Sequence, residues 1–287
     1  MENDKTNYNR PKLTLGFIVI LLCTFIAMPI NAASFDIIEG KELSVVFHAQ
    51  KSIKTKNTPL IVLDIDNTIL RSTKSLGTTW WFYAMKETAK NNGVSFDHRE
   101  RVLTSIEIEV QKKVERELVE SEIANLIIDP QQKGLVIALT SRPFSLYSPT
   151  VGQLSKQGVD LNTRYFQSIE KNWDGLGVFK DGIISVGGVN NKEVELATFL
   201  KLVANEYEID AIIFADDTYK YISSVGEFCE NNNLSYLGLH YTHEEENEKK
   251  FSINIAVNEL DDLLGESWGQ HFESAKEYAL YDPRITL

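Results

Sequence analysis

The chain has 287 residues, of which 43% are hydrophobic and 24% charged, a composition typical of a globular protein that buries a sizeable core. The formal net charge is −12 and the sequence carries no basic stretch, which argues against a protein that binds a nucleic-acid backbone. We therefore expect no nucleic-acid partner.

The first segment of the chain has the pattern of a secretory signal. Three basic residues precede an apolar run over 13–30, and Asn31-Ala32-Ala33-Ser34 follows. This order predicts a signal peptide over 1–33 that is cleaved near Ala32 or Ala33. The run is also long enough to be an uncleaved membrane anchor, although the small residues after it favour cleavage. We expect a periplasmic or secreted protein that contacts the membrane only if this segment is retained.

The next part of the chain is mostly helical, with one strand. Its predicted elements are a leading helix within 35–56, a buried strand over 60–65, a polar loop over 71–78, and helices from 80 to 128 with a turn at 91–93. The composition of 107–122 favours a helix with a solvated face.

From residue 135 onward, apolar strands alternate with helices. The predicted elements are strands at 135–139, 211–214 and 234–239, helices at 148–157, 192–206 and 219–230, and a hairpin over 178–188. Such alternation predicts an α/β fold, a three-layer Rossmann-like arrangement in which helices cover both faces of a mostly parallel sheet.

Polar residues follow several of these strands at the point where each strand ends. Asp64 and Asp66 follow the first strand, Thr140 the second, and Asp216 and Asp217 the strand at 211–214. The carboxyl ends of parallel strands lie at one edge of a sheet, where ligands bind, and Lys192 begins a helix near the same edge. Paired carboxylates suit a hard cation such as Mg²⁺ and offer a nucleophile beside an acid or base.

These residues, in this order, resemble the motifs of the haloacid dehalogenase superfamily of phosphohydrolases. The matching motifs are Asp64-Ile65-Asp66-Asn67-Thr68, Thr140, Lys192 and Asp216-Asp217, and the resemblance covers 58–71 and 133–240. The stretches 77–82 and 187–192 also resemble an uncharacterised, often secreted bacterial branch of that superfamily. Each motif alone is weak, and four in order are specific.

The resemblance implies a role for each of these residues. Asp64 is expected to attack phosphorus, and Asp66 to act as acid and then base while its backbone carbonyl helps to hold Mg²⁺. Thr140 and Lys192 are expected to bind a phosphoryl oxygen, with Lys180 as the alternative lysine. Asp216 and Asp217 are expected to complete the metal shell, with Asp217 favoured as the direct ligand. Because dehalogenases and ATPases of the superfamily lack an acid at the position of Asp66, the resemblance favours a phosphatase or a phosphomutase. Export favours a phosphatase acting on a small phosphorylated substrate.

The resemblance further divides the chain into a core and a cap. The core is expected over 34–71 and 132–287, with a helical cap inserted at 72–131. We expect substrate contacts from Thr68 and Ser141. Arg142 is expected either to contact phosphate or to pair with a carboxylate. Trp80 and Trp81 either line the mouth of the site or pack between cap and core.

Two other kinds of protein stay open at this point. A two-metal exonuclease also begins with acids on a strand, but the chain has no His–Asp pair at helical spacing near its C-terminus. The stronger rival is an exported binding or host-interaction protein of this fold with a vestigial site.

Overall fold

The computed structural model describes residues 33–57, 59–133, 135–162, 165–166, 171–172, 177–187 and 191–285. The predicted signal peptide or anchor lies outside the described residues, apart from Ala33. Within the described part of the chain, no helix combines the length and the apolar character needed to cross a membrane.

The strands and helices are as follows. The strands are β1 (Phe35–Gly40), β2 (Leu60–Leu63), β3 (Leu70–Ser72), β4 (Arg116–Leu118), β5 (Leu135–Thr140), β6 (Lys171–Asn172), β7 (Val178–Lys180), β8 (Ile183–Ser185), β9 (Ala211–Asp216) and β10 (Ser235–Tyr241). The α-helices are α1 (Ser44–Ala49), α2 (Thr79–Asn91), α3 (Phe96–Lys113), α4 (Ile123–Lys133), α5 (Tyr147–Lys156), α6 (Lys192–Val203), α7 (Tyr219–Asn231), α8 (Glu245–Glu248), α9 (Ile253–Leu264) and α10 (Ala275–Ala279). Two 3₁₀ helices are η1 (Phe144–Leu146) and η2 (Gly265–His271).

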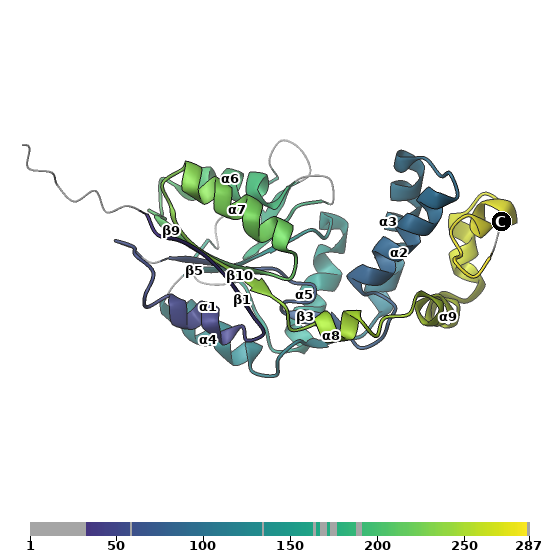
Figure 1. Ribbon diagram of the computed structural model, residues 1–287, viewed down its shortest axis with the longest axis horizontal. Helices are drawn as coiled ribbons and strands as arrows, with labels where there is room; N and C mark the ends of the chain where they lie inside the picture. The colour runs from purple at the N-terminus through teal and green to yellow at the C-terminus, as the bar shows by residue number, and fades with distance from the viewer. Residues whose placement is uncertain are drawn as a thin grey trace, which may run out of the picture. The chain divides into compact units, whose positions relative to one another are not determined.

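One large sheet organises the chain, and the predicted α/β fold class is confirmed. Within the described residues its order is β1-β10-β9-β2-β5-β8-β7-β6. In this order, the first six strands run parallel to one another, and β7 and β6 each pair antiparallel with the strand before them. Figure 1 labels β1, β10, β9 and β5 of this sheet. The predicted hairpin at 178–188 is confirmed as β7 and β8, which turn at Asp181-Gly182. β2 lies in the middle of this sheet, so its carboxyl end has neighbours on both sides.

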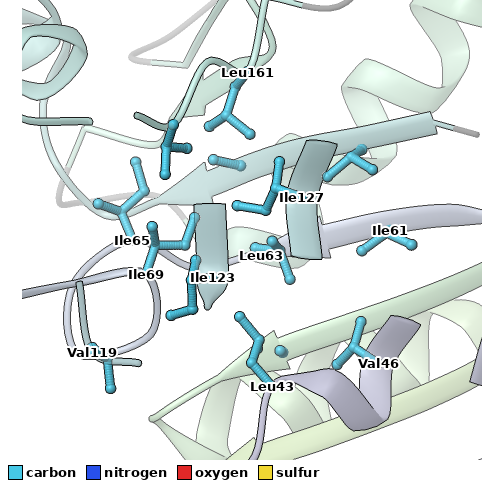
Figure 2. Close-up of a cluster of buried hydrophobic side chains, with 14 of the residues drawn as sticks. Leu43, Val46, Ile61, Leu63, Ile65, Ile69, Val119, Ile123, Ile127 and Leu161 are labelled. Carbon is cyan, nitrogen blue, oxygen red and sulfur yellow. The ribbon is translucent and has the colours of Figure 1, made fainter. Parts of the chain in front are cut away.

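Helices cover both faces of the sheet because its strands are apolar on both sides. Successive residues of a strand point to opposite faces. In β2, Ile61 and Leu63 join the hydrophobic cluster under α1, α4 and α5, whereas Leu60 and Val62 join the cluster under α6 and α7. Figure 2 shows part of the first cluster, with Leu43 of the segment before α1 and Ile127 of α4 facing the strands.

A third hydrophobic cluster holds the insert helices α2 and α3 together with the C-terminal helices. Val102 and Leu103 of α3 pack in it with Val257 of α9 and Trp268 of η2. Figure 1 shows α9 and the following C-terminal segment beside α2 and α3. Residues 251–285 therefore pack with the insert, although the sequence assigns them to the core. Conversely, α4, at the end of the expected cap, packs on the sheet.

The structure corrects three local predictions. Residues 35–40 form the edge strand β1 rather than part of a helix, because pairing with β10 supplies hydrogen-bond partners for the backbone of this segment. The predicted loop at 71–78 begins with two strand residues, Arg71 and Ser72 of β3. The helix predicted over 107–122 ends at Lys113, because 116–118 pair with 70–72 as β4.

Candidate active site

Three carboxylates meet at the carboxyl edge of the large sheet. Asp64 directly follows β2, and its backbone N–H donates to the carbonyl of Ala215 in the neighbouring strand β9. Asp216 is the last residue of β9, and Asp217 follows it. One carboxylate oxygen from each of Asp64, Asp216 and Asp217 lies within 4.8 Å of the others. We refer to these three residues as the carboxylate trio.

Lys192 is the only cation that the described residues place in hydrogen-bonding contact with the trio. It is the first residue of α6, and its side chain is 2% exposed. Its Nζ lies 2.5 Å from Asp64 Oδ1 and 2.7 Å from Asp216 Oδ2. Burial opposes its charge, but Asp216 and Asp64 outweigh burial and hold the pKa of Lys192 above its ordinary value. The lysine is therefore a fixed positive charge.

The trio is held where ionisation is costly. Burial is the largest cause that raises the pKa of Asp64 and of Asp216, and Lys192 opposes it in both cases. Burial, followed by the charge of Asp64, raises the pKa of Asp217 to about 7. When all three are ionised, Lys192 offsets one of the three negative charges. A divalent cation would offset the other two, and carboxylate oxygens are ligands that hard cations prefer. The trio can therefore hold a metal ion.

Asn67 links the trio to the insert. Its backbone has a φ of 59°, a left-handed conformation that Asn adopts more readily than most residues. Its side-chain Nδ2 donates to Asp217 Oδ2 at 2.9 Å and to Thr79 Oγ1 at 2.7 Å. Thr79 is the first residue of α2. The amide therefore orients a carboxylate of the trio and fixes the start of an insert helix.

Asp66 does not share the trio's environment. Its two carboxylate oxygens accept hydrogen bonds from Nε and Nη2 of Arg142, each at 2.7 Å, and Arg116 Nη1 lies 3.2 Å from Oδ1. Burial would raise the pKa of Asp66, but Arg142 and then Arg116 outweigh it and lower the pKa to about 2. Both arginines are buried, and Arg142 also donates to Thr150 and Gln153. We refer to Asp66, Arg116 and Arg142 as the arginine cluster.

The remaining core residues from the sequence prediction lie around these two groups. Thr140 ends β5, is buried, and accepts a hydrogen bond at Oγ1 from the backbone N–H of Arg142. Ser141 is half-buried beside it. Thr68 is fully buried, and its Oγ1 has no hydrogen-bond partner among the described residues. Lys180, the alternative lysine, is the last residue of β7. Its Nζ lies over the ring of Tyr147 rather than at the trio.

The two tryptophans of α2 lie in different surroundings. Trp81 is 1% exposed and belongs to the third hydrophobic cluster, which agrees with packing, the second of its two expected places, rather than with the mouth of the site. Trp80 is half-buried, packs against Phe251, and lines a polar cavity of about 470 Å³ that Asn67 also lines.

Sequence reasoning missed four residues that surround the site. Arg116 comes from β4 of the insert, Glu107 from α3 and Tyr83 from α2, and Asn67 was matched only as part of a motif. Burial, then Asp66, raises the pKa of Glu107 to about 7, and Arg142 and Arg116 oppose that rise. No signal in the sequence distinguishes Arg116 or Glu107 from the charged residues around them, because only folding brings the insert over the sheet edge.

Comparisons with known proteins show the family to which the chain belongs. A family profile described as "Protein of unknown function (DUF2608)" matches residues 42–264, so the chain belongs to that family. A Chlamydia pneumoniae protein named "Putative outer membrane protein" is 20% identical over 91% of this chain and 96% of its own length. A Chlamydia trachomatis serovar D protein of the same name is 24% identical over 80% of this chain and 85% of its own length. No solved structure matches the chain significantly.

Proposed function

We propose that this member of the DUF2608 family is an exported, Mg²⁺-dependent phosphohydrolase that cleaves small phosphomonoesters through an aspartyl-phosphate on Asp64. The observation that carries the proposal is the position of Asp64. It is a buried carboxylate at the end of a central strand, with Lys192 on one oxygen and two further carboxylates within 4.8 Å. The motifs that resemble the haloacid dehalogenase superfamily support the same reaction.

The first half of the reaction forms a bond between Asp64 and phosphorus. A carboxylate oxygen of Asp64 attacks the phosphorus atom, and the bond from phosphorus to the leaving oxygen breaks. The leaving oxygen keeps the electron pair of that bond and takes up a proton, from the acid form of Asp66 or from water, so that the alcohol departs. In the second half a water oxygen attacks the same phosphorus, Asp66 accepts the water proton, and the bond to Asp64 breaks. Inorganic phosphate leaves and Asp64 is regenerated.

The neighbouring residues would hold the charge that develops on the phosphoryl oxygens. Lys192 is a permanent cation beside Asp64, and the Thr140 hydroxyl can donate to a non-bridging oxygen from the end of β5. A bound Mg²⁺ would supply Lewis-acid stabilisation of the phosphoryl group, with Asp64, Asp216 and Asp217 as the residues that hold it. The unpartnered Oγ1 of Thr68, fully buried within the described residues, is a further polar atom at this edge.

Asp66 is better suited to the second half of the reaction than to the first. Both of its oxygens already accept hydrogen bonds from Arg142, which favours the carboxylate over the acid. A carboxylate can accept the proton of the attacking water directly. Protonating the leaving oxygen in the first half would require this contact to loosen.

Export is supported by the order of residues 1–33 and by the names of the two Chlamydia relatives, each called a putative outer membrane protein. Because a phosphomutase usually needs intracellular phosphorylated metabolites, an exported protein is better explained as a phosphatase.

The experiment is a hydrolysis assay on p-nitrophenyl phosphate and a panel of phosphomonoesters, with and without Mg²⁺. We expect turnover that needs Mg²⁺ and that Asp64→Asn abolishes, while circular dichroism shows the variant folded. Lys90→Gln, which changes only an exposed ion pair with Glu87, is the matched control and should keep full activity. A folded protein without turnover on any phosphomonoester would contradict the proposal and favour a binding protein with a vestigial site.

A further inference from the structure

We propose that the polar cavity lined by Asn67 and Trp80 is a binding site for a small polyhydroxy ligand, that is, a sugar or a sugar alcohol. The ligand is either a free sugar or the sugar part of a phosphate ester held at the trio, two sources that experiment can distinguish. The inference goes beyond the proposed function, because the cavity and its chemistry are the same whether or not the trio hydrolyses an ester.

The cavity lies where the insert meets the segment that follows β10. Its lining comes from β3 and the loop after it, from the start of α2, and from α8, α9 and the residues between them. Figure 1 shows α8 beside β3. The volume of about 470 Å³ is that of a small-molecule site. No carboxylate of the trio lines the cavity, but Asn67 does, and its Nδ2 donates to Asp217 Oδ2 at 2.9 Å. The cavity is therefore one hydrogen bond away from the trio.

The charges of the lining balance one another. The charged side chains are Arg71, Lys74, Lys250, Glu117, Glu244 and Glu259. Three are basic and three acidic, so the lining has no net charge that would select a strongly charged ligand. Arg71 pairs with Glu117 at 2.8 Å and with Glu244 at 3.1 Å, and Asn247 donates to the second oxygen of Glu244. These acids are already engaged, which leaves a bare cation no set of open carboxylates.

The other charged groups supply both donors and acceptors. Glu259 accepts the backbone N–H of Leu76 at Oε2. Within the described chain, its Oε1 and the Nζ atoms of Lys74 and Lys250 form no hydrogen bond or ion pair. An ammonium group can only donate, and a carboxylate can only accept. A ligand satisfies both kinds at once when its own polar groups donate and accept, and hydroxyl groups do both.

Two aromatic side chains give the lining an apolar part. Trp80 and Phe251 are both half-buried, and their ring centroids lie 6.2 Å apart with the planes inclined at 55°. The C–H bonds of a sugar ring form an apolar face that packs on aromatic rings, while its hydroxyl groups bond to polar side chains around it. A purely apolar ligand would leave the charged side chains without partners. The lining therefore fits a polyhydroxy ring best.

The first experiment asks whether a sugar binds. Saturation-transfer NMR on the purified protein would use glucose, galactose, ribose, maltose, sucrose and myo-inositol, with cyclohexanol as the ring that has a single hydroxyl group. We expect saturable binding of at least one sugar or of myo-inositol, and none of cyclohexanol. If none of the polyhydroxy compounds binds, or if cyclohexanol binds equally well, the inference is overturned.

The second experiment locates the bound sugar by calorimetry on variants that circular dichroism shows to be folded. Lys250→Met removes a donor and keeps the length of the side chain, so it should weaken binding about tenfold, as for loss of a hydrogen bond from a charged group. Trp80→Leu should weaken binding about threefold or more through loss of the ring. Lys249→Met is the matched control, because Lys249 is exposed and pairs with Glu246 instead of lining the cavity. Equal losses in Lys249→Met and Lys250→Met would place the sugar elsewhere and contradict the inference.

The third experiment distinguishes the two sources with the phosphate ester of the sugar that binds. If the sugar is a leaving group, this ester should have a higher kcat/KM than p-nitrophenyl phosphate, and Lys250→Met should reduce that preference. If the sugar binds free, Lys250→Met should weaken sugar binding and change hydrolysis of neither ester. Both results support the cavity as a sugar site. Sugar binding without hydrolysis of any ester would end the proposed function alone, and hydrolysis without sugar binding would end this inference alone.

Discussion

Arg142 donates to both carboxylate oxygens of Asp66, at 2.7 Å each, and so ties the end of β5 to the loop after β2. Arg116 approaches the same carboxylate from the insert at 3.2 Å. One acid therefore compensates two buried guanidinium groups that come from different parts of the chain. This contact has a consequence for stability that does not depend on any reaction.

Asp66→Asn should destabilise the fold strongly, by about 3–5 kcal/mol, because it leaves two buried arginines without their counter-charge. Urea unfolding followed by circular dichroism measures the change. Glu87→Gln, which removes the partner of Lys90 at an exposed pair, should change the unfolding free energy by less than about 0.5 kcal/mol. Similar small losses in both variants would show that the arginine cluster does not stabilise the fold.

The stability of the metal-free protein should fall as pH rises from about 4 to about 7. The pKa of Asp217 rises from 3.8 to about 7 in the folded chain, so in this window the native state holds a proton that the unfolded state has released. The contribution is full below the unfolded pKa and is lost above the folded one. Asp217→Asn, which carries no titrating proton, should show a smaller fall in thermal unfolding temperature over the same range.

Mg²⁺ should act in the opposite direction. Because it binds the ionised trio, the rise in unfolding temperature that it causes should be larger at pH about 8 than at pH about 5. Asp64→Asn should lose most of that rise at both pH values. A rise that is the same at both, or that survives in the variant, would place the bound metal elsewhere.

Asn67→Gly should weaken Mg²⁺ binding by about tenfold or more, the usual effect of removing a hydrogen bond to a ligating carboxylate. Glycine adopts the left-handed conformation of residue 67 without strain, so the variant removes the amide and keeps the backbone. Thr79→Val is the control, because it removes the other acceptor of the same amide and leaves the bond to Asp217. Calorimetry on both variants gives the affinities, and an unchanged affinity in Asn67→Gly would contradict the role of Asn67.

Gly182→Ala should destabilise the protein much more than Gly93→Ala, although both glycines have positive φ angles, of 78° and 82°. A Cβ on Gly182 would lie 2.0 Å from the carbonyl oxygen of Leu161, whereas one on Gly93 would meet nothing within 4 Å. Gly93→Ala should therefore show only the backbone penalty, about 1–2 kcal/mol, and Gly182→Ala a larger loss in urea unfolding. Equal losses would mean that the chain at Leu161 moves freely.

The sequence predicted the sheet and the polar residues at its carboxyl edge well because both follow from local patterns. A short run of apolar residues such as Leu60–Leu63 is typical of a strand that is buried on both faces. The acids directly after such a run then lie at the end of the strand. Lys192 was also expected near this edge, because it begins a helix there, and in the structure it contacts Asp64. Predictions failed where pairing between distant segments decides the structure, as for β1, which exists only beside β10, and for β3 and β4, which exist only together.

The sequence by itself determined the α/β class, the central strand and the residues that meet at its carboxyl end, because hydrophobic periodicity and the cost of burying carboxylates act locally. Only the tertiary structure decided which charges pair. Of the two partners expected for Arg142, a phosphate or a carboxylate, the structure shows the carboxylate of Asp66. Arg116 from the insert approaches the same carboxylate. The tertiary structure also buried Trp81, left Tyr83 exposed, and packed residues 251–285 against the insert. These outcomes depend on the packing of helices far apart in the chain, and no spacing within the sequence encodes them.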